Sequence, residues 1–165
     1  MKEIQKIQSK IYNLDELKNK ILCWQKENKK IVFTNGCFDI IHRGHVDYLA
    51  KAKDLGDILI IGLNTDSSVR NIKGITRPIQ DEESRAIILA SMQFVDAIVF
   101  FSDPTPYSLI KEIVPDVLVK GADYKKEDIV GYDIVTAKGG QIITIEFLEG
   151  YSTSNIERKI LTEKK

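Results

Sequence analysis

The stretch Ile31–His45, IVFTNGCFDIIHRGH, decides the fold of this 165-residue chain. It begins with the apolar run Ile31–Phe33, which is typical of a buried strand, and it ends where a helical pattern starts. It also contains both histidines of the chain, His42 and His45. Backbone N–H groups at a helix N-terminus are unpaired and carry positive partial charge, so a strand-to-helix junction is a natural anion site. The stretch therefore predicts a phosphate-binding loop after a core strand.

Strand-like and helix-like runs alternate from Ile31 onward. The run Ile58–Ile61 is apolar at every position, as in a parallel strand that helices cover on both faces. The pattern predicts an α/β fold, a Rossmann-like, doubly wound, mostly parallel sheet of about five strands. The expected strands are 31–34, 57–63, 97–101, 116–120 and 141–147. The expected helices are 14–28, 45–55, 81–93, 107–114 and 127–138, and a capping box at Ser154–Glu157 predicts a last short helix.

The length of the chain favours one domain over residues 1–165, made of an N-terminal helical extension, 1–30, and a core, 31–165. Asn13–Glu16 resembles a capping box, and apolar residues follow it at helical spacing. Trp24 of this helix could serve a core or an interface between subunits. The oligomeric state, including a homo-oligomer, therefore stays open at this point.

Lys and Arg together number 24 and so do Asp and Glu, which gives no general reason to expect nucleic acid or an anionic membrane as a partner. The N-terminus has no signal-peptide pattern, and no run approaches the roughly 20 apolar residues that span a bilayer. Cys23 and Cys37 fit neither a disulfide framework nor a zinc site. We expect a cytoplasmic protein that binds phosphate through a local site.

The histidine pair has two other interpretations, a metal site and a structural role. Gly44 separates the two residues, and the chain has no third histidine, which disfavours a metal site. Gly36 and Gly44 allow close backbone approach, and imidazoles can donate to oxyanions, so phosphate contact is preferred. Neither of the usual glycine-rich nucleotide motifs follows the first core strand, which disfavours dinucleotide oxidoreductases and P-loop kinases.

Ligands of doubly wound sheets bind beyond the carboxyl ends of the strands. After the second core strand, Lys73 and Arg77 could bind phosphates or lie on a solvated loop. Arg85, on the next helix, could reach the same phosphates or form a surface ion pair. Asn64 and Asp66 could contact hydroxyl groups of a ligand or cap the short helix that follows them.

Three further loops offer candidates of other kinds. Asp39 could order the loop or metal-bound waters, or it could fill a plain turn role. Tyr124 could stack on a ligand or pack. The hydroxyl groups and N–H groups at Ser152 and Thr153 can receive phosphate oxygens, while Ser154 caps the last helix.

The order of these motifs resembles the cytidylyltransferase-like nucleotidyltransferases, in which an H-x-G-H motif contacts a triphosphate. The matching segments are Gly36–Asp39, His42–His45, Gly62–Asp66, Lys73–Gly74, Arg77–Pro78, Glu83–Arg85, Val119–Tyr124 and Gly150–Thr153. As a set they are most similar to the adenylyltransferase domains of ADP-heptose synthases, here in a stand-alone form without the kinase portion. Glycerol-phosphate cytidylyltransferases are similar too, but Phe147 and Leu148 replace an arginine and a threonine of their R-T-E-G-I-S-T-T ending.

The resemblance implies transfer of AMP from ATP to D-glycero-β-D-manno-heptose 1-phosphate by direct attack of the sugar phosphate on the α-phosphorus. It implies Mg²⁺ carried with ATP, no metal site of the protein itself and no tightly bound organic cofactor. The implied catalytic residues are His42, His45 and Lys73. The implied nucleotide-binding residues are Asn35, Gly36, Cys37, Phe38, Gly44, Arg85, Lys120, Gly121, Asp123, Tyr124, Ser152 and Thr153. The implied substrate-binding residues are Asp39, Asn64, Asp66 and Arg77.

Three alternatives to this reaction stay open. The first is a cytidylyltransferase that acts on glycerol 3-phosphate or another small phosphate ester. The second is a sugar 1-phosphate nucleotidyltransferase that uses guanine or another base, because readout of a base by backbone groups leaves almost no trace in the side chains. The third is a nucleotide-binding sensor that has the fold without turnover.

Overall fold

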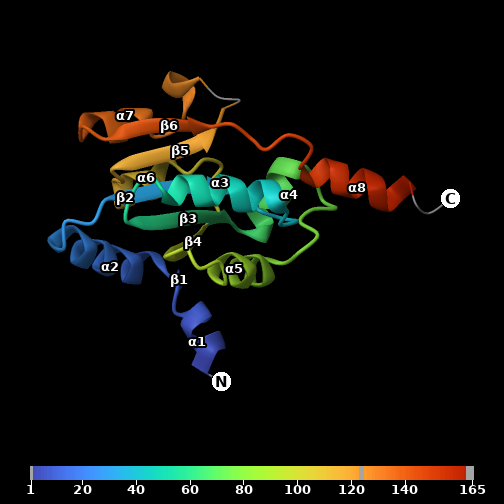
Figure 1. Ribbon diagram of the computed structural model, residues 1–165, viewed down its shortest axis with the longest axis horizontal. Helices are drawn as coiled ribbons and strands as arrows, with labels where there is room; N and C mark the ends of the chain where they lie inside the picture. The colour runs from blue at the N-terminus through green and yellow to red at the C-terminus, as the bar shows by residue number, and fades with distance from the viewer. Residues whose placement is uncertain (1, 123–124, 163–165) are drawn as a thin grey trace.

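The computed structural model describes residues 2–122 and 125–162, and its centre is one parallel sheet (Figure 1). The strands are β1 (Ile11–Tyr12), β2 (Ile31–Gly36), β3 (Ile58–Asn64), β4 (Ala97–Phe101), β5 (Val117–Gly121) and β6 (Gln141–Ile145). The helices are α1 (Lys2–Gln8), α2 (Leu14–Lys26), α3 (Arg43–Lys53), α4 (Asp66–Lys73), α5 (Glu82–Ala90), α6 (Tyr107–Ile113), α7 (Tyr132–Ala137) and α8 (Thr153–Thr162), with a 3₁₀ turn η1 (Lys126–Asp128).

Hydrophobic layers cover both faces of the sheet. Successive side chains of a strand point to opposite faces, so β3 sends Ile58 and Ile60 into one layer and Leu59 and Ile61 into the other. The first layer contains buried side chains of α2, α6 and α7, and the second contains those of α3 and α5. This arrangement confirms the doubly wound α/β fold.

The order of the strands reverses beside β2. The strands lie in the order β1-β4-β3-β2-β5-β6, and each pairing is parallel. The chain therefore runs from β2 outward to β3 and β4, then returns to place β5 on the other side of β2. In such sheets the crevice beyond the carboxyl ends of the strands at this reversal is the usual ligand site. Here the crevice lies between the ends of β2 and β5.

The structure has one strand more than the sequence predicts, because β1 pairs with β4 through Ile11 and Tyr12. The helix expected over 127–138 is also wrong in extent. It is divided into η1 and α7, since Gly131 has a φ of +91°. A Cβ at Gly131 would lie 2.8 Å from the side chain of Ile110, so close packing as well as conformation favours glycine there.

The N-terminal helix α2 packs into the core. Asn13 and Glu16 form the expected capping box, with 2.9 Å from the Glu16 N–H to the Asn13 side chain. Leu17, Ile21 and Trp24 are buried against the layer that covers one face of the sheet. Trp24 thus serves the core.

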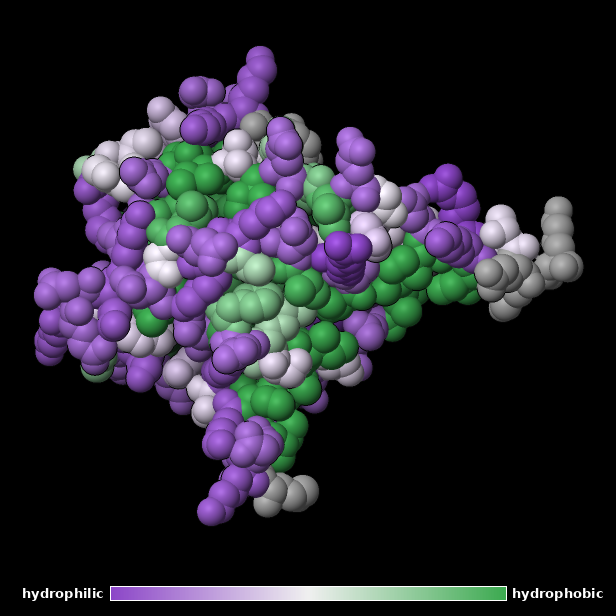
Figure 2. Space-filling model, in the orientation of Figure 1, coloured by the Kyte–Doolittle hydropathy of each residue, from purple (hydrophilic) through white to green (hydrophobic). Residues whose placement is uncertain are grey.

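The C-terminal helix α8 projects from the body of the molecule and contains no buried residue (Figure 1). Hydrophobic side chains gather along it and beside its base in the space-filling view (Figure 2). The exposed apolar residues of α8, α4 and the loop after α4 are Ile72, Ile75, Ile79, Ile160 and Leu161. Within residues 2–122 and 125–162, no helix combines the length and the apolar character that crossing a bilayer requires.

Candidate active site

A cavity of about 330 Å³ opens at the strand reversal, beyond the ends of β2 and β5. Ten residues that the sequence nominates line it: Asn35, Gly36, Cys37, Phe38, Asp39, His45, Lys73, Lys120, Gly121 and Thr153. They come from segments far apart in the chain, and the parallel sheet places the ends of those segments at one edge. Two further lining residues, Tyr48 and Phe147, are not among the predicted ones.

The two histidines lie at the N-terminus of α3. His42 is the N-cap residue, and its side chain makes no capping hydrogen bond. Its ring stacks on that of His45, with centroids 3.8 Å apart and planes inclined by 22°. The edge of Phe38 contacts His45 from another side, at 5.3 Å between centroids. The pair is therefore held in one arrangement by ring packing.

Gly44 makes room for this stack. A Cβ at position 44 would lie 3.0 Å from the His42 ring and 3.2 Å from the Cβ of Tyr151. A side chain there would push His42 or the segment that contains Tyr151 away. Gly44 thus acts through the position of His42, although it does not itself line the cavity.

Burial keeps both imidazoles neutral. Burial lowers the pKa of His42, and burial together with the charges of His42 and Lys73 lowers the pKa of His45 to about 4, with the Ile40 backbone partly offsetting the effect. The Nδ1 atoms of both rings are buried and have no hydrogen-bond partner of good geometry among the described residues. Buried polar atoms are normally satisfied, so an anionic ligand beside this pair would gain its hydrogen bonds.

Two lysines flank the cavity. Lys73 is the last residue of α4, and its charge disfavours protonation of His45. Lys120 lies on β5 and donates to the Oδ1 atom of Asn35 on β2. The cavity therefore combines neutral imidazole donors with one cation from the end of α4 and one from the end of β5, which suits a ligand with several phosphates.

Cys37 is a protonated thiol in this cavity. Burial raises its pKa, and the charges of Lys73 and Arg85 only partly oppose that effect. Its Sγ atom lies 3.9 Å from the Oδ1 atom of Asn64. A thiol with a raised pKa is a poor nucleophile at neutral pH.

Asp39 holds the loop after α4 in place. Its buried carboxylate accepts the backbone N–H groups of Ile79 and Gln80, at 2.7 and 3.0 Å, and pairs with Arg77 at 2.5 Å. Burial alone would raise the pKa of Asp39, but these hydrogen bonds and the Arg77 charge lower it. Arg77 also pairs with Glu157 of α8. Asp39 and Arg77 are thus engaged with each other, with backbone N–H groups and with α8, which gives them a positioning role, and the expected substrate contact stays a prediction.

Arg85 is fully buried, which contradicts the expectation of a surface ion pair. Its guanidinium donates to the carbonyl oxygens of Cys37 and Asn64, at 2.6 and 2.8 Å, and to that of Gln80 at 3.1 Å. It also pairs with Asp66 at 2.7 Å. Every nitrogen of the guanidinium is engaged, so Arg85 joins the ends of β2 and β3 to the loop after α4 and does not present a free donor to a phosphate.

Asn64 and Asp66 do not line the cavity. Asn64 is buried and donates to the Oγ atom of Ser68 at 2.9 Å, while Asp66 pairs with Arg85. Neither residue caps α4. The cap is Thr65, whose side chain accepts the N–H of Ser68 at 3.3 Å. Asn64 and Asp66 thus contact other residues of the protein and lie outside the cavity lining.

The start of α8 reaches the cavity through Thr153. The Oγ atom of Ser152 accepts the N–H of Asn155 at 3.1 Å, so Ser152 caps the helix and the expected capping box at Ser154 is wrong. The segment before the cap packs on α3, where Arg43 donates to the Tyr151 hydroxyl at 3.1 Å. Asp123 and Tyr124, the other expected nucleotide contacts, lie outside the described residues.

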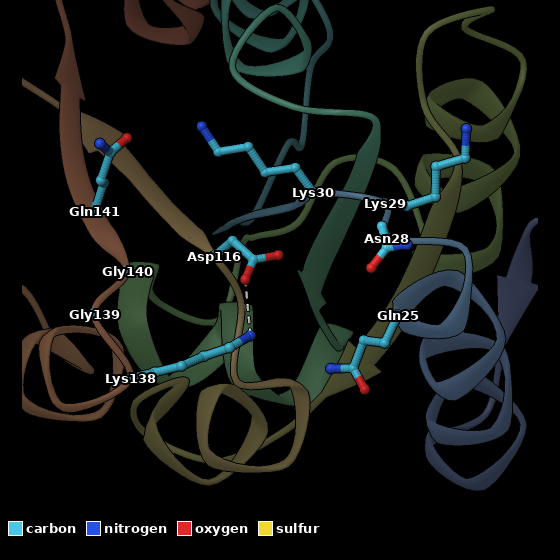
Figure 3. Close-up of a pocket in the computed structure, with 9 residues that line it drawn as sticks. All are labelled: Gln25, Asn28, Lys29, Lys30, Asp116, Lys138, Gly139, Gly140 and Gln141. Atoms are coloured by element: carbon cyan, nitrogen blue, oxygen red, sulfur yellow. Dashed lines mark ion pairs between the residues drawn. The ribbon is translucent and has the colours of Figure 1, made fainter.

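A larger depression, about 580 Å³, lies at the opposite edge of the sheet, where β2, β5 and β6 begin (Figure 3). Lys138 pairs with Asp116 there at 2.9 Å, and Asp116 also accepts the N–H of Ile31. None of the predicted site residues lines it. It is remote from the histidine pair, and its charged groups serve the strand ends.

The described part of the chain has no cluster of three or more His, Cys, Asp or Glu side chains that could hold a metal ion. Asp39 is the carboxylate that lines the cavity, and both of its oxygens accept hydrogen bonds from the protein. Any divalent cation that acts here would therefore take its ligands mainly from phosphate oxygens and water.

Comparison with known proteins gives consistent matches. The family model for cytidylyltransferase-like proteins matches residues 33–159. The bifunctional protein HldE of Citrifermentans bemidjiense is 52% identical over 154 residues, which is 93% of this chain and 32% of that protein. The HldE protein of Campylobacter jejuni subsp. jejuni is 51% identical over 157 residues, 95% of this chain and 32% of that protein. The chain thus spans about a third of the length of these curated relatives.

Two solved structures share the architecture. The lipopolysaccharide core biosynthesis protein from Thermoplasma volcanium GSS1 is 28% identical with a TM-score of 0.59, over 75% of this chain and 99% of that one. The pantoate-beta-alanine ligase from Francisella tularensis, complexed with a form of ATP and beta-alanine, has a TM-score of 0.61 over 89% of this chain and 75% of that one. At 19% identity, the second likeness concerns the fold alone.

Proposed function

Since the chain belongs to the cytidylyltransferase-like family of nucleotidyltransferases, we propose that it transfers AMP from ATP to D-glycero-β-D-manno-heptose 1-phosphate and releases pyrophosphate. The observation that carries this proposal is the stacked pair His42 and His45, with orphaned ring nitrogens beside two cavity lysines. The HldE relatives support the heptose substrate, because their likeness extends over 93–95% of this chain.

In this proposal the triphosphate lies along the histidine pair. His42 and His45 donate hydrogen bonds to its oxygens, and Lys73 neutralises charge on the leaving pyrophosphate. The first N–H groups of α8, beside Thr153, and those of α3 point positive partial charge at the same region. These groups act most strongly on the transition state, where negative charge builds up on the departing oxygen.

The reaction needs neither a general base nor a covalent intermediate. An oxygen of the sugar phosphate is already an anion, and it attacks the α-phosphorus directly. A new P–O bond forms while the bond from the α-phosphorus to the bridging oxygen breaks, and that oxygen leaves with the pyrophosphate. The thiol of Cys37 is kept protonated by its raised pKa, which argues against a nucleophilic role for it. Catalysis then comes from positioning and charge stabilisation.

Magnesium enters as the complex with ATP in this scheme. It neutralises phosphate charge and usually retains several of its own waters, so it needs few protein ligands. Asp39 is engaged with Arg77 and backbone N–H groups, and its contribution is to hold the loop after α4. The protein's own task is to fix the triphosphate in line with the incoming sugar phosphate.

The substrates can be tested by measuring pyrophosphate release with magnesium and matched pairs of substrates. We expect release with ATP and the heptose 1-phosphate. Release with CTP and glycerol 3-phosphate alone would overturn the heptose proposal, and release with GTP and a sugar 1-phosphate would overturn the choice of adenine. Tight nucleotide binding without release in any pair would favour a nucleotide sensor.

A further inference from the structure

Phe147 is an exposed aromatic ring on the wall of the active-site cavity. It follows β6 and is 56% exposed, whereas Phe38 and Tyr48, which also line the cavity, are each 6% exposed. A ligand that covers an exposed apolar ring gains hydrophobic free energy. Phe147 therefore offers an open apolar face in a cavity that polar and charged side chains also line.

The ring of Phe147 has a fixed aromatic neighbour. Tyr48 of α3 lies beside it, with ring centroids 6.0 Å apart and planes inclined by 36°. Tyr48 is held in turn, because its hydroxyl and the Oγ1 atom of Thr34 lie 2.8 Å apart. A ring whose neighbour is held in place loses little freedom when a flat ligand stacks on it.

The cavity lining combines two kinds of group. His45, Lys73, Lys120 and Thr153 supply donors and positive charge, and Phe147 supplies an exposed apolar ring. Phe147 lies near the end of the β5–β6 pairing, where Gly121 is in register with Ile145 and the Ala122 N–H donates to the Ile145 carbonyl at 3.0 Å. A nucleoside triphosphate presents the complementary groups, an anionic chain and a flat base.

From this geometry we infer that Phe147 is the stacking platform for the nucleobase of the nucleoside triphosphate. The inference rests on the proposed function and adds a binding residue to it. The base is favoured over the sugar because Phe147 lies beside the backbone at the end of β5, which can contact the edge of a planar ring. Stacking supplies affinity for any base, and backbone contacts distinguish one base from another.

The experiment compares binding of magnesium–ATP with binding of magnesium tripolyphosphate, which has no base, by isothermal titration calorimetry. In Phe147→Ala we expect ATP to bind roughly tenfold more weakly and tripolyphosphate to bind as in the wild type. Phe147→Trp should restore the ATP affinity, and Phe147→Leu should restore only part of it. Tyr107→Ala removes an exposed aromatic ring that does not line this cavity and should leave both affinities unchanged.

Three outcomes would overturn the inference. Equal weakening of ATP and tripolyphosphate in Phe147→Ala would mean that the ring only shapes the cavity. Unchanged ATP affinity with a higher KM for the sugar phosphate would place the sugar on the ring instead. Failure of the wild-type chain to bind either magnesium–ATP or tripolyphosphate would remove the proposed function itself, and this result is distinguishable because it does not depend on Phe147.

Discussion

The rings of His42 and His45 stack with centroids 3.8 Å apart at the first turn of α3. Stacked imidazoles disfavour two charges at once, and burial lowers the pKa of each. Both rings therefore favour the neutral form, and their Nδ1 atoms have no hydrogen-bond partner of good geometry among the described residues. In the proposed complex, a triphosphate would supply such partners.

Removal of either imidazole should slow the reaction greatly. We expect His42→Ala and His45→Ala each to lower kcat by about 10²–10³-fold, because each loses a donor to the transition state. The double variant should lose less than the product of the two effects, since the rings act as one unit. Pyrophosphate release measures turnover, and circular dichroism checks the fold. Near-normal turnover in both single variants would contradict the assigned role.

Stability should fall as the pH drops through the range set by His45. The folded protein holds the pKa of His45 at about 4, below the ordinary 6.5, so the unfolded chain binds this proton first. The contribution of neutral, buried His45 to the free energy of unfolding is therefore complete above pH 6.5 and is lost as the pH falls toward 4. Urea unfolding at about pH 7.5 and about pH 5 measures the loss. His45→Asn should show a smaller loss, and an identical loss would refute this explanation.

The two carboxylates that flank Arg77 should differ in their effect on stability. The side chain of Asp39 is 1% exposed and that of Glu157 is 33% exposed. Asp39→Asn should reduce the free energy of unfolding by about 3 kcal/mol, because it leaves a mostly buried Arg77 without its buried anionic partner. Glu157→Gln should cost less than about 1 kcal/mol. Urea unfolding of both variants provides the comparison, and equal losses would mean that burial does not control this network.

Gly44→Ala should impair turnover more than folding. The new methyl group would meet the His42 ring at 3.0 Å, and the flexible way to relieve that contact is to move the ring off His45. We expect kcat to fall by about tenfold or more, with a change in unfolding free energy of about 1 kcal/mol. Val46→Ala changes an exposed side chain in the same helix and serves as the control. Unaltered kcat in Gly44→Ala would show that the stack tolerates displacement.

The sequence predicted most of the sheet because its signals there are local. β3 is apolar at consecutive positions and β2 leads into the H-x-G-H motif, so both strands stand out without any knowledge of neighbours. The strand β1 was missed because the two residues Ile11–Tyr12 are too few to show a periodic pattern. Only their pairing with β4 defines them as a strand. Gly131 breaks the expected helix over 127–138 through a positive φ that the apolar pattern around it does not reveal.

The residues of the candidate site likewise divide into those that local sequence signals predicted and those whose role depends on the fold. His45, Lys73, Lys120 and Thr153 meet at one cavity because each lies near the start or the end of an element at the carboxyl edge of the sheet. The buried role of Arg85 could not be predicted, because an arginine on a helix ordinarily faces solvent and only the surrounding carbonyl groups reveal its use. Phe147 was expected as the last residue of a strand over 141–147, whereas β6 ends at Ile145, and its place on the cavity wall depends on the fold of β6 beside α3.

The stereochemistry at the α-phosphorus tests direct transfer at this site most directly. The chain would be incubated with one diastereomer of adenosine 5′-O-(1-thiotriphosphate), magnesium and the heptose 1-phosphate, and the product would be examined by phosphorus NMR. A single in-line attack by the sugar phosphate predicts a thio-ADP-heptose with inverted configuration at the α-phosphorus. Retention of configuration would reveal a covalent enzyme intermediate and would contradict the mechanism, and absence of any thio-ADP-heptose under conditions where ATP is bound would contradict the reaction itself.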